Sequence, residues 1–434
     1  MFQTFLILFS FPLFPLISNN ILFFKFKYED LNTTNDLSIF QSLFSNHLIT
    51  TLEIGNPIQK INVYISLKDY EFYLAENKQN ETSYNYEKSK FSKQKSKLLE
   101  FYDSPYLNGI YFQDQFNFNS TNGEIIKTNF SFILAKNLLS NVYSTIGLSF
   151  HNPSDDFNIN FMNQLKNLKI ISNLTWNIKY INEKENILSI GKNPDEYDLT
   201  YKKENLHFTK IAFNDMYSDW NLYFDNIYFN NKENKIEFKG EKICEINFER
   251  ALIKGPFEYK KLFFESVFNN NDCQEISYFS NLYYVCNKNT KISDLPNIYL
   301  KNRELNYTFE LNYNDLFIEI NDKLYFLVYF NNLDNKNFKY WILGKPFLKK
   351  FHLIFENEKK LIGFYQINTY NYFIYFQIVL ISILTIIFIV LLILFIRSSK
   401  YSVRKRRKNE VEEDYDYSTR YSDYSLLNPT NNFI

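Results

Sequence analysis

Hydrophobic and polar residues alternate in short runs through the middle of this chain. Between residues 47 and 366 the repeated unit is a run of five to eight β-branched and aromatic residues, bounded by Asn, Asp, Lys or Gly, as in LITTLEI, INVYISL, WNIKYI and YFLVYF. Runs of this length with period-two alternation are typical of β-strands. Helical periodicity is confined to residues 161–168 and 259–268. The pattern therefore predicts a mostly β protein.

Both ends of the chain carry longer apolar segments. Residues 1–18 are almost wholly apolar and are followed at once by polar asparagines, which is typical of a secretory signal peptide. Residues 373–396 carry no charge and are long enough, as a helix, to cross a hydrocarbon core of about 30 Å. Lys and Arg are frequent directly after this segment and absent directly before it. The positive-inside rule therefore predicts a single-pass type I protein of the secretory pathway or cell surface, with residues 397–434 in the cytoplasm.

Glycosylation acceptors and cysteines agree with an oxidising, lumenal environment for the body. All six N-x-S/T sequons precede the apolar segment, although an Asn-rich chain also produces sequons by chance; they are Asn32, Asn80, Asn119, Asn129, Asn173 and Asn306. Among three cysteines, Cys273 and Cys286 could close a short disulfide loop and leave Cys244 odd. The four histidines are scattered and none has metal-ligand spacing to a cysteine, so no metal site is expected.

Composition and charge exclude several classes of protein. The chain has 434 residues, of which 45% are hydrophobic, and 48 Lys and Arg balance 48 Asp and Glu. A disordered chain would be less hydrophobic, and a protein that binds nucleic acid through phosphates would have a basic surplus. Nucleotide-binding, zinc-protease and serine-hydrolase motifs are absent. We therefore expect no cofactor and no nucleic-acid partner.

Six segments, in order along residues 45–366, resemble the pepsin family of aspartic proteases. They are IGNPIQ (54–59), a flap-like stretch (98–114) with Tyr102 in place of the flap tyrosine, STIGL (144–148), NILSIG (186–191), DWNL (219–222) and WILGKPFLKKFHLIFENEKKLIGFY (341–365). The resemblance implies a bilobal, nearly all-β fold with an interlobe cleft that binds an extended peptide or protein ligand. Its lobes are expected at 47–195 and 196–366, after a leader or pro-segment remnant at 19–46. It also implies that Gly55, Gly147 and Gly344 are structural supports.

The two catalytic positions depart from the family pattern. The resemblance places the first aspartate at Ser66, within Ser-Leu-Lys-Asp, and the second at Asn247, within Asn-Phe-Glu. Family chemistry needs two carboxylates that share one proton, so that one activates water and the other protonates the peptide carbonyl. Neither Ser nor Asn titrates between pH 3 and 7. No intact catalytic pair is therefore predicted.

Three functions fit this sequence. The first is an inactive pepsin-like protein, a pseudoprotease whose cleft binds a peptide or protein. The second is an active aspartic endopeptidase that uses Asp69 or Glu249 as substitute acids. The third is a purely structural surface glycoprotein. Proteolysis by two substitute acids would require each loop to present its side chain on another face.

The C-terminal segment, residues 397–434, suggests contacts with lipid and with sorting proteins. Its basic start is typical of a segment that lies against anionic lipid, and its acidic, Tyr- and Ser-rich remainder predicts a tail without fixed structure. Tyr424 and Leu427 fit a tyrosine-based sorting signal that binds adaptors.

Overall fold

The computed structural model describes residues 21–28, 39, 48–76, 83–95, 99–100, 108–120, 123–136, 144–150, 159–181, 186–212, 220–230, 235–260, 264, 268, 273–278, 281–291, 295–331, 341–366 and 369–424. The chain divides into two compact units, Met1–Gln366 and Ile367–Ile434. The first unit is built almost entirely of β-strands, so the mostly β prediction is confirmed.

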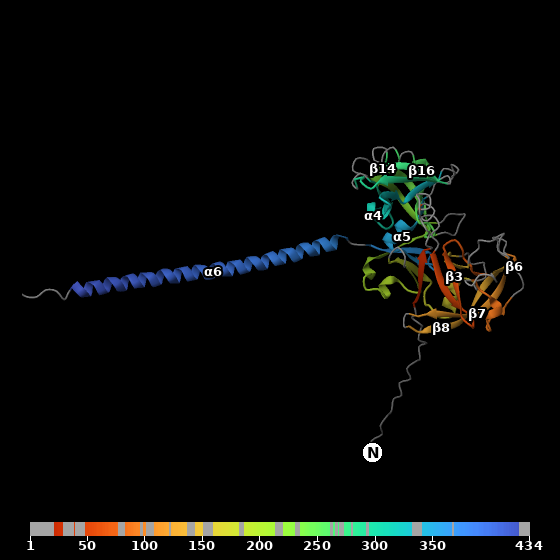
Figure 1. Ribbon diagram of the computed structural model, residues 1–434, viewed down its shortest axis with the longest axis horizontal. Coiled ribbons are helices and arrows are strands. Elements are labelled where there is room, and N and C mark those ends of the chain that lie inside the picture. Colours follow the sequence, from red (N-terminus) through yellow and green to blue (C-terminus); the bar gives the residue numbers. More distant parts are fainter. Residues whose placement is uncertain are drawn as a thin grey trace, which may run out of the picture. The chain divides into compact units, whose positions relative to one another are not determined.

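The N-terminal lobe extends from β1 to β11 (red to yellow in Figure 1). Its strands are β1 (Leu22–Tyr28), β2 (Leu48–Ile54), β3 (Gln59–Ser66), β4 (Phe72–Ala75), β5 (Lys93–Gln94), β6 (Leu99–Glu100), β7 (Asn108–Asn119), β8 (Ile125–Lys136), β9 (Thr145–Gly147), β10 (Thr175–Tyr180) and β11 (Asn186–Ile190). A 3-10 turn, η1 (Tyr86–Lys88), and one helix, α2 (Phe161–Asn167), complete its described elements.

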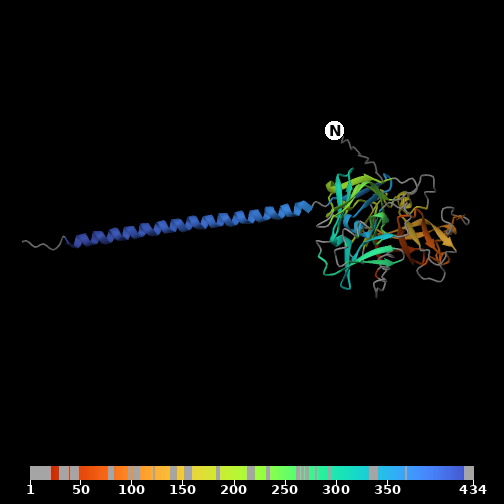
Figure 2. The same ribbon diagram turned by 90° about the horizontal axis from the view of Figure 1, so that it is seen from above.

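The C-terminal lobe extends from β12 to β25 (green to blue in Figures 1 and 2). Its strands are β12 (Leu206–Lys210), β13 (Asn221–Asn230), β14 (Lys235–Ile246), β15 (Ile253–Gly255), β16 (Cys273–Tyr278), β17 (Asn281–Asn287), β18 (Asn297–Asn302), β19 (Tyr307–Leu311), β20 (Phe317–Ile320), β21 (Lys323–Phe326), β22 (Val328–Asn331), β23 (Trp341–Leu343), β24 (Ile354–Glu356) and β25 (Leu361–Tyr365). Short helical elements are η2 (Pro194–Glu196) and η3 (Lys203–Asn205) before β12, and η4 (Phe257–Tyr259), α4 (Tyr313–Leu316) and α5 (Lys345–Phe351) within the lobe.

The lobes share one sheet. In the 14-stranded sheet, β24 pairs with β10, and β25 links β24 to β12. Strands from the end of the C-terminal lobe thus extend a sheet that begins in the N-terminal lobe. A second sheet of 11 strands belongs to the C-terminal lobe alone. Because β10 and β24 are hydrogen-bonded neighbours, the two lobes are held together by backbone pairing as well as by side chains.

Residues 22–28 belong to the folded body, whereas the sequence analysis placed them in a leader. Strand β1 pairs with β11 through five residues and with β2 through two. The reason is a period-two pattern in which Leu22, Phe24 and Phe26 are buried. The segment LFFKFKY therefore has a strand signal of its own.

The two predicted helices have different outcomes. Residues 161–167 of the predicted 161–168 segment form α2, and Leu168 is its C-cap. The helix begins after Asn160, whose side chain accepts a hydrogen bond from the Asn163 backbone. Only part of the predicted 259–268 helix lies among the described residues, where Tyr259 ends η4.

The second unit is one long helix, α6 (Thr369–Tyr424), which contains the predicted span at 373–396. Within α6, Gln377–Arg407 is long and apolar enough to cross a membrane. The hydroxyls of Ser382 and Thr385 donate to backbone carbonyls of the same helix, as polar groups in an apolar helix must. The helical backbone continues to Tyr424, so the prediction of a tail without fixed structure is wrong up to that residue. Extending an existing helix is far easier than starting one, and Arg, Lys and Glu there are good helix formers.

Candidate functional site

Two short loops, one from each lobe, have the same construction. The first loop (67–71) joins β3 to β4, and the second loop (247–252) joins β14 to β15. Strand β9 lies between β3 and β4, parallel to the first and antiparallel to the second. Strand β23 lies in the same way between β14 and β15. Ser66 ends β3 and Asn247 follows β14, so the two predicted positions occupy corresponding places in the two lobes.

A glycine packs directly under each loop. A Cβ atom on Gly147 would lie 2.4 Å from the Asp69 carbonyl oxygen, and one on Gly344 would lie 2.2 Å from the Leu252 carbonyl oxygen. Both approaches are far shorter than any real Cβ contact, so only glycine fits. The same backbone also holds the loops, because Leu148 N–H donates to the Ser66 carbonyl at 2.8 Å. The sequence analysis proposed Gly147 and Gly344 as supports, and the structure places them in contact with the two loops.

The loops meet through Ser66 and Glu249. Ser66 is buried, and its Oγ donates a hydrogen bond to Glu249 Oε1 at 2.7 Å. The backbone N–H of Leu67 donates to the same carboxylate oxygen at 3.2 Å. Ser66 Oγ also accepts hydrogen bonds from the N–H groups of Lys68 and Asp69, at 3.2 and 3.3 Å. The serine hydroxyl is therefore fixed by three partners, one of which belongs to the opposite lobe.

Asn247 is held from its own loop. It is buried, its Nδ2 donates to Glu245 Oε1 at 2.9 Å, and its Oδ1 accepts from the Glu249 N–H at 3.0 Å. Glu245 also pairs with Lys68 of the first loop, Nζ to Oε1 at 3.7 Å. Because the Lys68 side chain is 53% exposed, solvent screens this ion pair and its contribution is small. Ser66 and Asn247 are thus joined indirectly, through Glu249.

Asp69 is the second carboxyl group near Ser66. Burial raises its pKa, and the negative charges of Glu249 and Glu71 raise it further, while the Ser66 hydroxyl and Lys68 act in the opposite direction. Burial, followed by the charge of Asp69, also raises the pKa of Tyr73 to about 12. The structure therefore brings the two substitute acids of the sequence analysis, Asp69 and Glu249, to the same serine.

An aromatic cluster packs against the second loop. Trp176 of β10 stacks on Phe355 of β24, with ring centroids 4.0 Å apart, and contacts Phe248 of the second loop edge to face at 6.2 Å. Trp220 packs against Trp176 at 5.9 Å and donates its indole N–H to the Leu148 carbonyl at 3.2 Å. The cluster joins residues of both lobes, and a shift of the second loop would disturb its buried packing through Phe248.

Gly55 has a different neighbourhood from the other two glycines. Its φ is +85°, which favours glycine, and a Cβ there would meet Ser89 Oγ at 2.8 Å. Ser89 Oγ and the Tyr84 hydroxyl both donate to the buried Asp114 carboxylate, at 3.0 and 2.6 Å. Gly55 therefore supports the turn between β2 and β3 next to a buried polar network. The sequence analysis did not foresee that network.

The other predicted site residues are placed as follows. Cys273 and Cys286 form a disulfide between β16 and β17, and Cys244 is free and buried. The sequon asparagines that the structure describes are all exposed; they are Asn119, Asn129, Asn173 and Asn306. Tyr102, Asn32, Asn80 and Leu427 lie outside the described residues, and Tyr424 is the last residue of α6.

The sequence analysis did not assign a role to three residues that contact the loops or their neighbours: Glu245 on β14, Lys68 in the first loop and Trp176 on β10. Glu245 lies two positions before Asn247 on β14, and the alternation of side chains along a strand could have placed both on one face. Nothing in the sequence signals the contact of Lys68 with Glu245. Among the described residues, no group of three or more His, Cys, Asp or Glu side chains is arranged to hold a metal ion.

The comparisons with known proteins identify the class. The sequence matches the eukaryotic aspartyl protease family over residues 48–367, so the chain belongs to that family. The pepsin-like fold expected from the sequence motifs is therefore confirmed. A comparison with proteins of curated function finds no match.

Two solved plant proteins share the fold. Basic 7S globulin from soybean is 13% identical with a TM-score of 0.59, and the match covers 80% of this chain and 95% of that one. Conglutin gamma, a basic 7S globulin from lupine seeds, is also 13% identical, with a TM-score of 0.61 and the same coverage of 80% and 95%. At this identity the likeness concerns the fold alone.

Proposed function

We propose that this protein is a membrane-anchored member of the aspartyl protease family that binds extended peptides in its cleft without hydrolysing them. The observation that carries the proposal is the pair Ser66 and Asn247, which occupies corresponding places in the two loops. Neither side chain ionises between pH 3 and 7. A peptide bond placed over the loops would therefore meet neutral groups where the family has two acids.

The hydrogen bonds of these two residues support the same conclusion. The Ser66 hydroxyl donates its hydrogen bond to Glu249, and the amide of Asn247 bridges Glu245 and the Glu249 backbone. An aspartic protease needs a carboxylate that activates water and a second, protonated carboxyl group that donates to the peptide carbonyl. Peptide binding needs neither, because main-chain hydrogen bonds and side-chain pockets are sufficient.

The proposal is tested by peptide binding to the full-length protein in lipid nanodiscs. We expect saturable binding of some members of an extended-peptide library at pH 5 and pH 7, followed by fluorescence anisotropy, with the peptides recovered intact by mass spectrometry. Tyr102→Ala should weaken this binding by about 1–3 kcal/mol, because it removes an aromatic contact and a hydroxyl group. Tyr401→Ala, which changes an exposed tyrosine of α6, is the matched control. Absence of binding at both pH values would favour a purely structural surface glycoprotein.

A second candidate function rests on Asp69. The structure places this carboxyl group and Glu249 at one serine, and the raised pKa of Asp69 is a property that a general acid requires. Asp69 and Glu249 would then replace the missing pair in an active endopeptidase, with the Ser66 hydroxyl between them. Cleavage of an unfolded protein that Asp69→Asn and Glu249→Gln each abolish would select this function over the first.

The membrane topology is also part of the proposal. The apolar Gln377–Arg407 segment of α6 and the exposed sequon asparagines support a type I protein of the secretory pathway or cell surface, made with a signal peptide at 1–18. Tyr424 and Leu427 would then lie in the cytoplasm and could bind sorting adaptors. In sealed microsomes we expect the body to resist protease and to carry glycans, while the tail is digested. A protected tail would reverse this orientation.

A further inference from the structure

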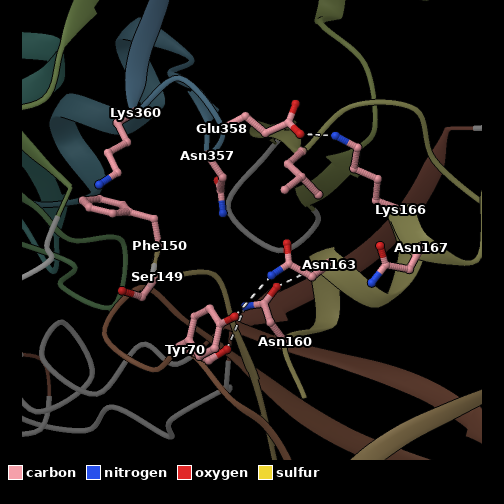
Figure 3. A pocket seen from close by; sticks show the side chains of 11 residues that line it. Tyr70, Ser149, Phe150, Asn160, Asn163, Lys166, Asn167, Asn357, Glu358 and Lys360 are labelled. Atoms are coloured by element: carbon pink, nitrogen blue, oxygen red, sulfur yellow. Dashed lines mark hydrogen bonds and ion pairs between the residues drawn. The ribbon is translucent and has the colours of Figure 1, made fainter. Parts of the chain in front are cut away.

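A polar cavity of about 440 Å³ lies beside the first loop (Figure 3). Its walls come from both lobes: Tyr70 of the first loop and the α2 region form one side, and residues 357–360, in the turn between β24 and β25, form the other. The volume is within the range of roughly 300–1,000 Å³ that small-molecule sites occupy. The Ser66–Glu249 contact is not part of this lining, so the cavity is a separate candidate site.

One wall presents an unused hydrogen-bond donor. The Asn357 Oδ1 accepts the indole N–H of Trp176 at 3.0 Å. Because an indole nitrogen can only donate, this bond fixes the amide orientation and leaves Nδ2 as the free end. Within the described part of the chain, Nδ2 of Asn357 has no hydrogen-bond partner. In Figure 3 it points from the β24–β25 turn toward Asn160 and Asn163.

The opposite wall presents an unused acceptor. Asn163 Nδ2 donates to the Tyr70 hydroxyl at 3.2 Å, and among the described residues its Oδ1 has no partner. Asn160 holds this wall in place, since its Nδ2 donates to the Tyr70 carbonyl at 2.9 Å and its Oδ1 accepts from the Asn163 backbone at 3.0 Å. Two amide side chains therefore face one cavity from two lobes. The indole N–H orients that of Asn357, whereas the Tyr70 hydroxyl both donates and accepts and so is compatible with either orientation of the Asn163 amide.

The charged side chains of the lining are engaged with one another or with a ring. Lys166 forms an ion pair with Glu358 across the rim of the cavity. The ammonium of Lys360 lies 5.6 Å from the centroid of the Phe150 ring. A charged ligand would have to compete with these contacts, whereas an uncharged ligand would not.

We propose that this cavity is a binding site for a small uncharged ligand rich in hydroxyl groups, of the size of a hexose. A hydroxyl group both donates and accepts, so one ligand can satisfy Asn357 Nδ2 and Asn163 Oδ1 together. The apolar surfaces of Phe150 and Leu174 provide contacts for the C–H groups of a sugar ring. Both amide side chains are half-buried, so a hydroxyl group of the ligand would replace water as their hydrogen-bond partner while the ligand ring covers the neighbouring apolar surface.

The test uses the full-length protein in nanodiscs, which avoid sugar-headed detergents. Glucose, galactose, mannose and N-acetylglucosamine are the uncharged probes, and glucuronate and glucosamine are the charged ones. Saturation-transfer NMR and calorimetric titration should show saturable binding of at least one uncharged sugar. Binding of none of them, or tighter binding of glucuronate than of every uncharged sugar, overturns the proposal.

Two variants locate the binding. Asn163→Leu keeps the size of a half-buried side chain and suits a helix, and it removes the acceptor; we expect about tenfold weaker sugar binding. Asn289→Leu changes an exposed asparagine after β17 and should leave the affinity unchanged. Equal effects of the two variants, or no effect of Asn163→Leu, would contradict the assignment.

A third variant tests Asn357, on the wall formed by the turn between β24 and β25, while keeping its hydrogen bond to Trp176. Asn357→Asp retains the acceptor for Trp176 and converts the free donor into a negatively charged acceptor. The preference for glucosamine over glucose should therefore rise relative to the wild-type protein. An unchanged ratio would show that Asn357 does not contact the sugar. The peptide assay uses another class of ligand and another variant, so the two proposals can fail separately.

Discussion

The hydroxyl of Ser66 donates to the Glu249 carboxylate at 2.7 Å across 183 residues of sequence. Ser66 ends β3 directly before the first loop, and Glu249 lies in the second loop, so the bond connects the two lobes at the place where the family resemblance predicts the catalytic pair. A carboxylate acceptor makes this bond stronger than one between neutral groups. Because Ser66 is buried, solvent has little access to the serine end of this bond.

The bond should be measurable by a double-mutant cycle. For Ser66→Ala and Glu249→Ala we expect a coupling energy of about 1–2 kcal/mol in the free energy of unfolding, because the bond is charge-assisted and shielded. Chemical denaturation of the full-length protein gives the four values. The exposed pair Thr51 and Asn62, whose side chains are hydrogen-bonded at 3.0 Å, is the matched control and should couple by less than about 0.5 kcal/mol. Equal coupling energies of the two pairs would show that the bond between Ser66 and Glu249 stabilises the protein no more than an exposed hydrogen bond does.

The strands and both loops could be predicted from the sequence because their signals are local. Period-two alternation marks the strands, and the spacing from the segments that resemble the family places Ser66 and Asn247 at corresponding positions. The pairing of Ser66 with Glu249 could not be predicted, since alternation says which face a side chain occupies and not which distant residue it meets. The same limit applies to the amide groups of Asn163 and Asn357, which face one cavity although the sequence shows no motif there.

Two departures from the expected organisation also have local causes. Strand β1 was assigned to a leader because the family resemblance begins only at His47, yet its own alternation was visible in the sequence. The helix beyond residue 397 was missed because acidic and Tyr-rich composition suggested a tail without structure. Composition alone ignores that a span helix has already been nucleated next to it.

The glycines beneath the loops should tolerate no side chain. Gly147→Ala and Gly344→Ala would each bring a Cβ within 2.4 Å of a loop carbonyl, so we expect a loss of about 1–3 kcal/mol in unfolding free energy. Gly123→Ala is the control, because its φ is +78° but nothing lies within 4 Å of the added Cβ. It should cost about 1 kcal/mol through backbone conformation alone. Thermal unfolding of the three variants checks the order, and an equal loss in all three would contradict steric crowding at the loops.

Asp69 and Asp198 should affect stability with opposite signs. Burial and the Glu249 charge raise the pKa of Asp69, so the folded state binds its proton more tightly than the unfolded state does. Stability then falls as pH rises from the unfolded pKa through the folded pKa. Asp69→Asn should therefore stabilise the protein at pH 7 relative to wild type, and this gain should disappear below about pH 4.

For Asp198, burial acts upward, but hydrogen bonds from Lys179 and Thr200 outweigh it and lower the pKa to about 2. Its contribution is present above the unfolded pKa and is lost as pH falls toward the folded value. Asp198→Asn should thus destabilise the protein at pH 7 and have little effect near pH 2. Melting temperatures of both variants between pH 2 and 7 give the comparison. Changes of the same sign in the two variants would show that burial does not control Asp69.

Hydrolysis is the property that separates the two candidate functions. We expect the full-length protein to leave unfolded casein intact at every pH from 2 to 7, because Ser66 and Asn247 supply no titratable group.

If Asp69 and Glu249 acted instead, one would have to be ionised and the other protonated, and activity would follow a bell-shaped pH profile. It would also be blocked by a statine-type transition-state mimic. Asp69→Asn and Glu249→Gln would each abolish it, whereas Asp225→Asn, which changes an acid on β13 away from both loops, would leave it intact. Mass spectrometry of the casein after incubation measures cleavage by the wild-type protein and the variants. Cleavage that is lost in Asp69→Asn and Glu249→Gln and kept in Asp225→Asn would show that the protein is an active endopeptidase.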